Sequence, residues 1–253
     1  MLMSVAGKLI PFQPRILWQP DITRLSRRIG LRTIGSIGGR VLVCPCDRVD
    51  GFETGAKADF WTELVGALYD VVSSPVHCGS YAALSSNSDA TWYYSLTPSL
   101  VKWFKLYFRI VPNPDSPPTG VSSGGKLLAV CLGPKEVHLY VVTGGAVSPR
   151  FQIQTAAGPT VNGITPLQVN TWYCVELRVE GNTSGGVQKL YLDGVLEITV
   201  NYDTDGYDFS ELDLGCVQWT FGMDCRTAID CYCQTDDDTQ PGCNDAAHPE
   251  CYR

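Results

Sequence analysis

Residues 170–200 read NTWYCVELRVEGNTSGGVQKLYLDGVLEITV, and apolar and polar side chains alternate through most of this stretch. A period of two is typical of an extended strand with one face in a core, because successive side chains of a strand point to opposite sides. Asp193 and Gly194 separate two such runs, and this dipeptide is the strongest short-range signal for a type I′ hairpin. We therefore expect three antiparallel strands, the first with Tyr173 and Val179 on its inward face.

The chain from residue 47 onward contains similar short runs, about a dozen in all, at the spacing typical of a β-sandwich. The clearest of them, KWFKLYFRIV at 102–111, should place Phe104 and Phe108 in the core and Trp103 on the outer face. With 253 residues, the chain is long enough for one large all-β domain. We predict an all-β fold, a two-sheet antiparallel jelly-roll sandwich with an extended N-terminal arm and a Cys-rich C-terminal tail.

Composition and charge divide the chain into three segments. The first, 1–46, is an extended basic arm, and its first 40 residues hold seven basic side chains and one acidic side chain. The second, 47–235, is the jelly-roll body, and the third, 236–253, is an acidic tail that contains cysteines. The whole chain has a formal net charge of −7, so a basic arm precedes an acidic remainder. Such an arm is suited to docking on an acidic surface, such as the body of a neighbouring copy.

The arm also carries residues suited to anchoring it on a partner. Prolines keep this part of the chain extended, so its large apolar side chains have little to pack on within the arm. On a partner, Phe12 and Trp18 would be the main contacts, and Arg24, Arg27 and Arg28 would pair with acidic neighbours. The basic run has no interleaved aromatic side chains for stacking on bases, so we do not expect nucleic acid as a partner.

Helix and membrane signals are sparse. No run of consecutive apolar residues reaches the length of a membrane span, about 18 residues or more. The N-terminal stretch MLMSVAGKLIPFQPR lacks the pattern of a secretory signal peptide, because Lys8 and two prolines interrupt a short apolar run. A short helix is expected at 21–29, with Asp21 as its N-cap and Gly30 as its C-cap.

The chain contains 11 cysteines, an odd number, so at least one cannot pair within a single chain. Cys243 and Cys251 flank a short polar loop, and a disulfide between them would contribute about 2–3 kcal/mol by restricting the unfolded chain. Cys131 and Cys174 lie in expected central strands, where we predict buried free thiols. No C-x-x-C pair occurs and histidine is scarce, so a zinc finger is not expected.

Seven motifs stand in the order DGFETG, SSPVHCGSYAALSS, LYFRI, NTWYCVELRVEG, KLYLDGVLE, FSELDLG and AIDCYCQT, all within residues 50–235. This order resembles that of the concanavalin A-like lectin and glucanase superfamily, most closely its laminin-G-like jelly-roll members. The resemblance implies one structural calcium ion where the first and last strands meet. Here its ligands would be Glu53 and Asp230, with backbone carbonyls near Gly79, since oxygen ligands suit Ca²⁺.

The superfamily includes glycoside hydrolases and polysaccharide lyases, but their motifs are incomplete in this chain. The laminarinase-type motif supplies two glutamates as nucleophile and acid. FSELDLG offers Glu211 and Asp213, but Gly215 and Cys216 stand where the second glutamate belongs. The alginate-lyase-type motif needs an arginine where CVELR has Cys174, and a histidine where QIQ has its second glutamine. We therefore expect no enzymatic activity.

Outward-facing aromatic side chains suggest a surface for sugar binding, because aromatic rings stack on sugar rings while polar neighbours fix the hydroxyls. The candidate residues are Trp103, Tyr107, Arg109, His138 and Tyr140. The same side chains would also suit packing against another part of the protein or against another subunit.

Three functions remain open. The first is a non-catalytic structural or adhesion module, as in a phage virion protein of the capsid-decoration or tail-associated kind, with a lectin-like body anchored by its arm. Its partners would be copies of itself, other virion proteins and a cell-surface glycan, in the virion or extracellular space. The second is a carbohydrate-binding lectin module. The third is a glycoside hydrolase or polysaccharide lyase with a degenerate motif.

Overall fold

The structure is a computed structural model that describes most of the body with short gaps. The described residues are 46–63, 69–85, 91–112, 125–132, 135–142, 148–156, 158–182, 185–204, 209–217, 225–236, 238 and 240–242, together with the backbone of four short strands between residues 4 and 44. Those four strands form two hairpins that join neither of the main sheets: β1 (Ser4–Val5) with β2 (Lys8–Leu9), and β3 (Arg32–Ile37) with β4 (Arg40–Cys44).

Several predictions from sequence lie outside the described residues. They are the helix at 21–29, the anchor residues Phe12, Trp18, Arg24, Arg27 and Arg28, and the disulfide between Cys243 and Cys251. Within the described part of the chain, no helix is long and apolar enough to span a membrane.

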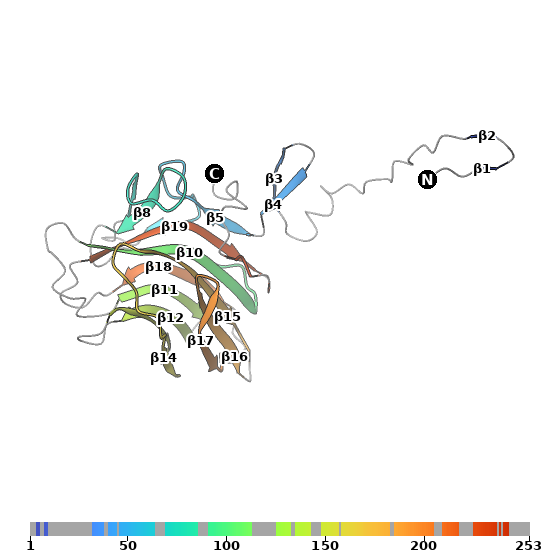
Figure 1. Cartoon of the computed structure of the whole chain (residues 1–253). Coiled ribbons are helices and arrows are strands. Elements are labelled where there is room, and N and C mark those ends of the chain that lie inside the picture. Colours follow the sequence, from blue (N-terminus) through green and yellow to red (C-terminus); the bar gives the residue numbers. More distant parts are fainter. Residues whose placement is uncertain are drawn as a thin grey trace.

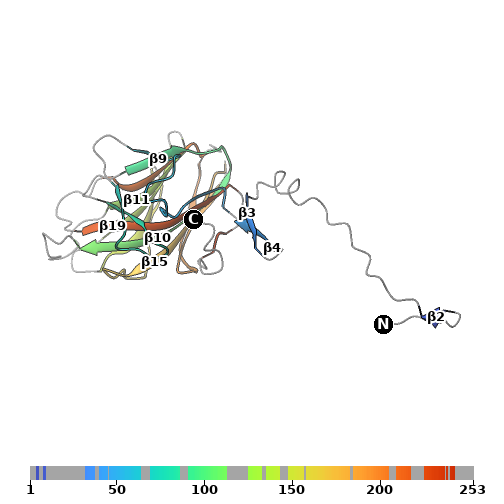
Figure 2. The ribbon, with the colours of Figure 1, turned by 90° about the horizontal axis from the view of Figure 1, so that it is seen from above.

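The larger of the two main sheets has eight antiparallel strands (Figure 1), and Figure 2 shows three of them, β19, β10 and β15, side by side. In spatial order the strands are β17 (Val195–Tyr202), β16 (Gly186–Leu192), β15 (Trp172–Glu180), β10 (Val101–Pro112), β19 (Cys225–Thr235), β8 (Ala82–Ser85) and β7 (Tyr69–Val72), with β5 (Arg48–Asp50) also paired to β19. β19 changes its edge neighbour along its length, because β8 pairs with residues 228–229 and β5 with residues 232–234. Residues 230–231 lie at the changeover.

The second main sheet has seven antiparallel strands and packs against the first. In spatial order they are β14 (Thr160–Asn162), β13 (Arg150–Thr155), β12 (Lys135–Val142), β11 (Gly125–Leu132), β18 (Glu211–Val217), β9 (Thr91–Ser95) and β6 (Thr62–Glu63). Side chains from both sheets form one apolar core between them.

The alternation of side chains places the core as the sequence predicts. Phe104 and Phe108 of β10 and Tyr173 of β15 are buried in the core between the sheets. Asp193 and Gly194 connect β16 to β17 with φ angles of 50° and 79°, and a type I′ turn needs positive φ at both positions. The prediction of an all-β, two-sheet antiparallel sandwich is confirmed.

The chain enters and leaves the body at one place. A disulfide joins Cys46 to Cys233 of β19, with their Cα atoms 5.6 Å apart. Beside it, Asp47 N donates to Gln234 O at 2.7 Å, and Asp236 N donates to Asp47 Oδ2 at 2.6 Å. Cys46 is 4% exposed, so the disulfide is buried where the predicted arm meets the body.

The outer face of the eight-stranded sheet is covered by the chain that follows β19. Asp238 Oδ1 accepts hydrogen bonds from Arg178 Nε at 2.7 Å and from Trp103 Nε1 at 3.4 Å. Gly242 N donates to Glu176 Oε1 at 2.7 Å, and Glu176 is fully buried. β15 was expected to have one solvent-facing side, but this covering segment buries part of that side as well.

Two disulfides connect described cysteines, Cys46–Cys233 and Cys78–Cys231. Cys174 is also disulfide-bonded, so the prediction of a free thiol there is wrong. Its side chain packs with the other cysteines on the outer face of the sheet, away from the sealed core, where a second segment of chain can reach it. The predicted free thiol of Cys131 lies outside the described side chains.

Candidate functional site

The outer face of the seven-stranded sheet carries a line of polar side chains. β11 pairs with β18 and β12, so that Ala129 lies opposite Asp213 on one side and His138 on the other. β12 pairs with β13, so that His138 lies opposite Gln154. Because paired residues of a sheet point to the same side, Asp213, His138 and Gln154 stand in one row, with the small Ala129 between the first two.

Further polar side chains flank this row. In the next row on one side, Glu136 and Glu211 are each paired with Cys131. In the next row on the other side, Tyr140 is paired with Gln152. The set is called the polar face below and comprises Lys126, Glu136, His138, Tyr140, Gln152, Gln154, Glu211 and Asp213.

His138 links two neighbours on its own strand. Its Nδ1 lies 3.1 Å from Tyr140 OH, and its Nε2 contacts Glu136 Oε2. Burial lowers the pKa of His138 and the charge of Lys126 lowers it further, while Glu136 opposes both effects. His138 is therefore neutral at pH 7, and both contacts are satisfied when Nε2–H donates to Glu136 and Nδ1 accepts from Tyr140.

The polar face has an excess of negative charge. It holds three carboxyl groups, Glu136, Glu211 and Asp213, against the ammonium group of Lys126, and Arg150 lies on the same side one row beyond Tyr140. Burial raises the pKa of Asp213, and the charge of Glu211 raises it further. Burial and then Glu136 raise the pKa of Tyr140, so its hydroxyl stays protonated. The face therefore presents closely spaced donors and acceptors that suit a ligand rich in hydroxyl groups and without negative charge.

The structure does not bring the five predicted sugar-binding residues together. His138 and Tyr140 belong to the polar face, whereas Trp103, Tyr107 and Arg109 lie on β10 in the other sheet. The alternation correctly predicts which side chains of each strand point away from the core. It does not predict to which of the two sheets the strand belongs, and therefore on which outer face of the sandwich these side chains lie.

The expected aromatic surface on β10 is also buried. Trp103 and Tyr107 are only 4% and 7% exposed. Asp238 lies over Trp103, and the His77 ring stacks on Tyr107 with 3.5 Å between ring centroids. Arg109 is bound to Asn170 Oδ1 at 2.9 Å. Neither aromatic ring offers a free face to a sugar, so the expectation of an exposed aromatic surface here is wrong.

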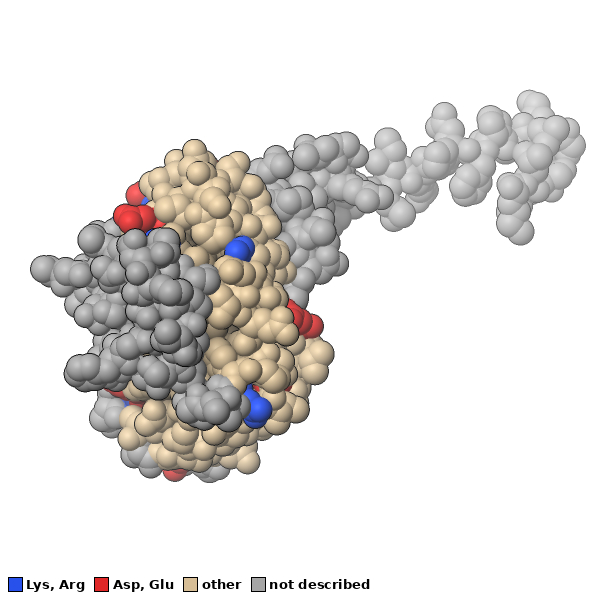
Figure 3. Space-filling view, turned by 60° about the vertical axis from the view of Figure 1, so that its left-hand side comes forward, with Lys and Arg blue, Asp and Glu red and all other residues tan. Residues whose placement is uncertain are grey.

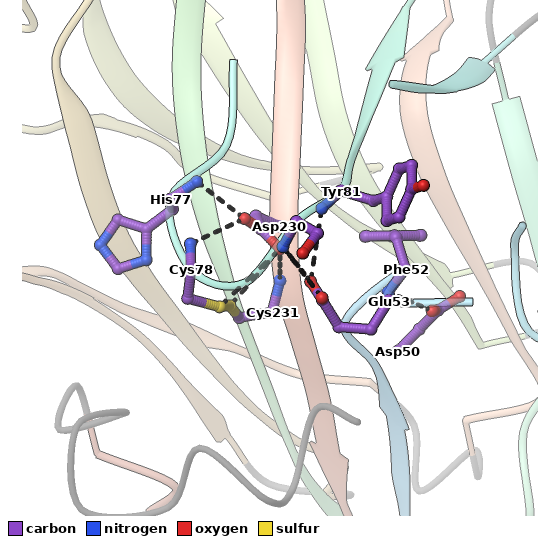
Figure 4. Close-up of a disulfide and its surroundings, with 9 residues drawn as sticks. Asp50, Phe52, Glu53, His77, Cys78, Tyr81, Asp230 and Cys231 are labelled. Carbon is purple, nitrogen blue, oxygen red and sulfur yellow. Dashed lines mark hydrogen bonds between the residues drawn. A yellow bond between two sulfur atoms is a disulfide. The ribbon is translucent and has the colours of Figure 1, made fainter. Parts of the chain in front are cut away.

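The predicted calcium ligands, Glu53 and Asp230, meet the same loop between β7 and β8 (Figure 4). His77 N and Cys78 N donate to Asp230 Oδ2 at 2.8 and 3.1 Å. Ser80 N donates to both carboxylate oxygens of Glu53, at 3.0 and 2.9 Å. Two carboxylates far apart in sequence are thus held by neighbouring backbone amides of one loop.

Gly79 makes this close approach of Glu53 possible. Its φ is +71°, at which a residue with a side chain is strained, and a Cβ added to it would lie 2.0 Å from Glu53 Oε1 and so displace that carboxylate. The pKa of Asp230 is raised to about 7, chiefly by burial and to a smaller extent by the charge of Glu53, although hydrogen bonds from the backbone N–H groups of Cys78, His77 and Cys231 lower it. Two converging carboxylates that repel each other fit a divalent cation, which would offset the repulsion. We propose that Glu53 and Asp230 bind calcium.

A cavity of about 600 Å³ opens beside the point where the chain enters the body. Its lining residues are Asp47, Arg48, Val49, Asp59, Phe60, Thr97 and Asp236. The Arg48 guanidinium lies 4.6 Å from the ring centroid of Tyr94 and 5.4 Å from that of Phe60. The sequence analysis did not identify this cavity, because its lining comes from segments that are far apart in the chain.

No family model and no curated protein matches this sequence. Solved structures do match the fold. The receptor-binding domain of botulinum neurotoxin D matches with a TM-score of 0.53 and 11% identity, over 78% of this chain and 50% of that chain. Domain 4 of AbnA, an extracellular arabinanase from Geobacillus stearothermophilus solved with arabinotriose, matches with a TM-score of 0.51 and 14% identity, over 76% of this chain and 93% of that chain. The chain spans about half the length of the toxin chains that it matches. These likenesses support the fold, a sandwich of two antiparallel sheets.

Proposed function

We propose that this protein is a carbohydrate-binding, lectin-like module whose polar face binds a neutral glycan. The observation that carries the proposal is the row of Asp213, His138 and Gln154 across three strands, with Tyr140 and Glu136 bonded to the histidine. Sugar hydroxyls both donate and accept hydrogen bonds, and this set offers both functions within one sheet face. Its negative charge disfavours glycans that carry carboxylate or sulfate groups.

The likeness of fold supports this proposal at the level of architecture. One matching structure is a toxin's receptor-binding domain, and another is a domain solved with arabinotriose. A sandwich of this kind therefore hosts sites that bind other molecules, although the fold alone does not determine the ligand.

We propose binding without turnover. Retaining hydrolysis needs two carboxyl groups about 5–5.5 Å apart, on either side of the bond that breaks. Glu211 and Asp213 are two residues apart on one face of β18, as the sequence predicts, and Gly215 continues that face without a side chain. The pair therefore has no partner further along its own strand.

Replacing His138 by alanine is expected to weaken glycan binding by at least about tenfold, because Tyr140 and Glu136 lose the hydrogen bonds to the imidazole that hold them in place, and such bonds contribute about 1–3 kcal/mol. The ligand is found first on an array of neutral and acidic glycans, and the affinity of the variant is then measured by titration calorimetry. Asp59→Ala, in the cavity at the entry to the body, is the matched control and should bind as the unaltered protein does.

Each alternative has its own outcome in these experiments. Loss of binding in Asp59→Ala, with normal binding in His138→Ala, would move the site to the cavity. Release of reducing ends or unsaturated sugars from a panel of polysaccharides, abolished in Glu211→Ala, would show an enzyme. Exclusive binding of acidic glycans would contradict the charge argument.

We further infer that the body is displayed on the outside of an assembly, such as a phage virion, with copies of itself and other virion proteins as partners. The basic segment 1–46 and the acidic remainder carry opposite charges, which favours contact between one copy's arm and a neighbour's body. Disulfides within the body fit an oxidising, extracellular setting. On the side shown in Figure 3, the basic side chains of the described residues lie apart and form no broad patch.

A protein that starts at Cys46 is expected to fold and melt cooperatively but to stay out of the assembly. Keeping Cys46 preserves its disulfide to Cys233. Occupancy on purified particles is measured by labelling with an antibody to the body. A shortened protein present at normal occupancy would contradict the anchoring role of the arm.

A further inference from the structure

The loop between β7 and β8 meets β19 at a group of metal-binding side chains. A ring nitrogen of His77 and the sulfur atoms of Cys78 and Cys231 all lie within 4.8 Å of one another. Asp230 Oδ1 is 3.4 Å from the Cys231 sulfur and 4.0 Å from the Cys78 sulfur. Figure 4 shows the four side chains together, with the two sulfurs joined as a disulfide.

An irregularity in β19 places two of these residues side by side. In a regular strand Asp230 and Cys231 would point to opposite faces. Here the pairing of β10 with β19 shifts register between Lys105 and Tyr107, and Cys231 has a φ of 50°, which is uncommon for a residue with a side chain. Cys231 N donates to Asp230 Oδ1 at 2.7 Å and so stabilises this conformation. Both side chains therefore face the loop.

The loop holds the other two side chains in place. Asp230 Oδ2 accepts the backbone N–H groups of both His77 and Cys78, which fixes these neighbours against β19. The His77 ring is stacked on Tyr107 and lies edge-on to Trp172, with 3.5 and 5.7 Å between ring centroids. The ligand atoms thus come from a rigid strand and from a loop secured to it.

We propose that, when the Cys78–Cys231 disulfide is reduced, this group binds one zinc ion through the two thiolates, His77 and Asp230. Two thiolates, one imidazole and one carboxylate form a four-coordinate set that suits Zn²⁺. The disulfide takes two electrons and two protons from a dithiol, which becomes a disulfide itself, or two electrons from a phosphine and two protons from water, which turns the phosphine into its oxide. Either reaction gives two thiols. Zinc binding then releases the two thiol protons.

Two features of the geometry favour the metal form. The Cα atoms of Cys78 and Cys231 are 7.1 Å apart, just beyond the usual range for a disulfide, about 4.4–6.8 Å. A zinc ion held at about 2.3 Å from each sulfur keeps the sulfurs further apart than a direct bond does, which suits this spacing. His77 is exposed and Cys78 is partly exposed, so a reductant and an ion can reach them.

The disulfide and the zinc form exclude each other, because both use the same two sulfurs. In either form the loop stays attached to β19. The second disulfide offers an internal comparison: Cys46 and Cys233 are buried, and among the described residues neither belongs to a group of three or more potential metal ligands. Reduction of that pair is expected to create no zinc site.

The test uses the full chain, reduced with a phosphine and freed of metal, and titrated with zinc against a chromophoric chelator. One zinc ion per chain is expected in the reduced protein and none in the oxidised protein. Cobalt, bound in place of zinc, should give the intense d–d bands of a tetrahedral site and charge-transfer bands from thiolate. Zinc should also protect Cys78 and Cys231, identified by peptide mapping, from alkylation.

His77→Ala keeps both thiols and is expected to weaken zinc binding by more than the roughly 10–100-fold that loss of an outer-sphere partner costs. Cys46→Ser with Cys233→Ser is the matched control and should leave zinc uptake unchanged. The proposal is overturned if the reduced protein takes up no zinc, if Cys78→Ser with Cys231→Ser takes up as much, or if zinc protects other cysteines instead. Reduced protein that unfolds and is not refolded by zinc counts against it as well.

Discussion

Replacing Cys46 and Cys233 together by serine is expected to lower the free energy of unfolding by about 2–5 kcal/mol. Their disulfide closes a loop with a sequence separation of 187 residues, so it restricts the unfolded chain over most of its length. The loss should be near the upper end of this range, because the entropy of closing a loop grows with its length. Urea denaturation followed by fluorescence measures it.

The single variant Cys46→Ser is the control for the effect of the new hydroxyl group. It lacks the same cross-link and should lose a similar amount of stability, whereas reduction of the double variant should cost less than reduction of the unaltered protein. The hydrogen bonds of Asp47 with Gln234 and Asp236 remain in all these variants. A double variant as stable as the unaltered protein would show that these backbone contacts alone hold the two ends together.

Without calcium, the stability of the oxidised protein is expected to fall as the pH rises from about 4 to about 7. The pKa of Asp230 is about 7 in the folded protein, against 3.8 ordinarily, because burial raises it first and Glu53 adds to the effect. The folded state therefore binds a proton that the unfolded state has released, and this stabilisation is complete below about pH 4 and lost as the pH approaches 7. At about 1.4 kcal/mol per pH unit, the loss is on the order of 4 kcal/mol.

Calcium is expected to remove most of this pH dependence, because a divalent cation favours the ionised carboxylates. At a calcium concentration of about 100 times Kd the gain in stability is about 2.7 kcal/mol. Thermal denaturation at pH 5, 6, 7 and 8, with calcium or with EDTA, measures both effects.

Two variants separate the contributions to this pH dependence. Asp230→Asn should lose the pH dependence, and Glu53→Gln should shift it to lower pH, since one cause of the raised pKa is removed. Equal melting temperatures with EDTA and with calcium at pH 8 would rule out the calcium site.

The sequence predicted the fold where local rules decide it. Asp193 and Gly194 form the expected turn because few residues tolerate positive φ, and Phe104 and Phe108 are in the core because a strand alternates. The same rule correctly placed Trp103 on the outer face of its sheet. Whether the Trp103 side chain is exposed there depends on residues that are distant in sequence. Asp238, which covers Trp103, is 135 residues away in sequence, and no periodicity reports such a contact.

The sites show the same division. The resemblance to a known family pointed to Glu53 and Asp230, and the structure brings both to one loop. The polar face was only partly seen: Glu211 and Asp213 were considered as an isolated pair, and His138 as one of five residues on a single surface. Their adjacency follows from the register of β11 with both neighbours, which the sequence does not specify.

The cysteine group was missed for two physical reasons. Cys78 and Cys231 are 153 residues apart, so no short spacing marks them as partners. The shift in β19 that turns Asp230 and Cys231 to the same side interrupts the alternation that sequence analysis relies on. A glycine at position 231 would have indicated a positive φ, because glycine adopts such angles readily. A cysteine at this position gives no such indication.

The junction where the chain enters and leaves the body also decides how the molecule carries mechanical load. A pulling force that enters through the residues before Cys46 and leaves after Gln234 passes directly through the covalent bond to Cys233 and the adjacent backbone hydrogen bonds. The strands between them, which include the whole polar face, lie outside this line of tension. A tethered copy under shear would therefore keep its sandwich and its sheet faces undistorted until that one cross-link is reduced.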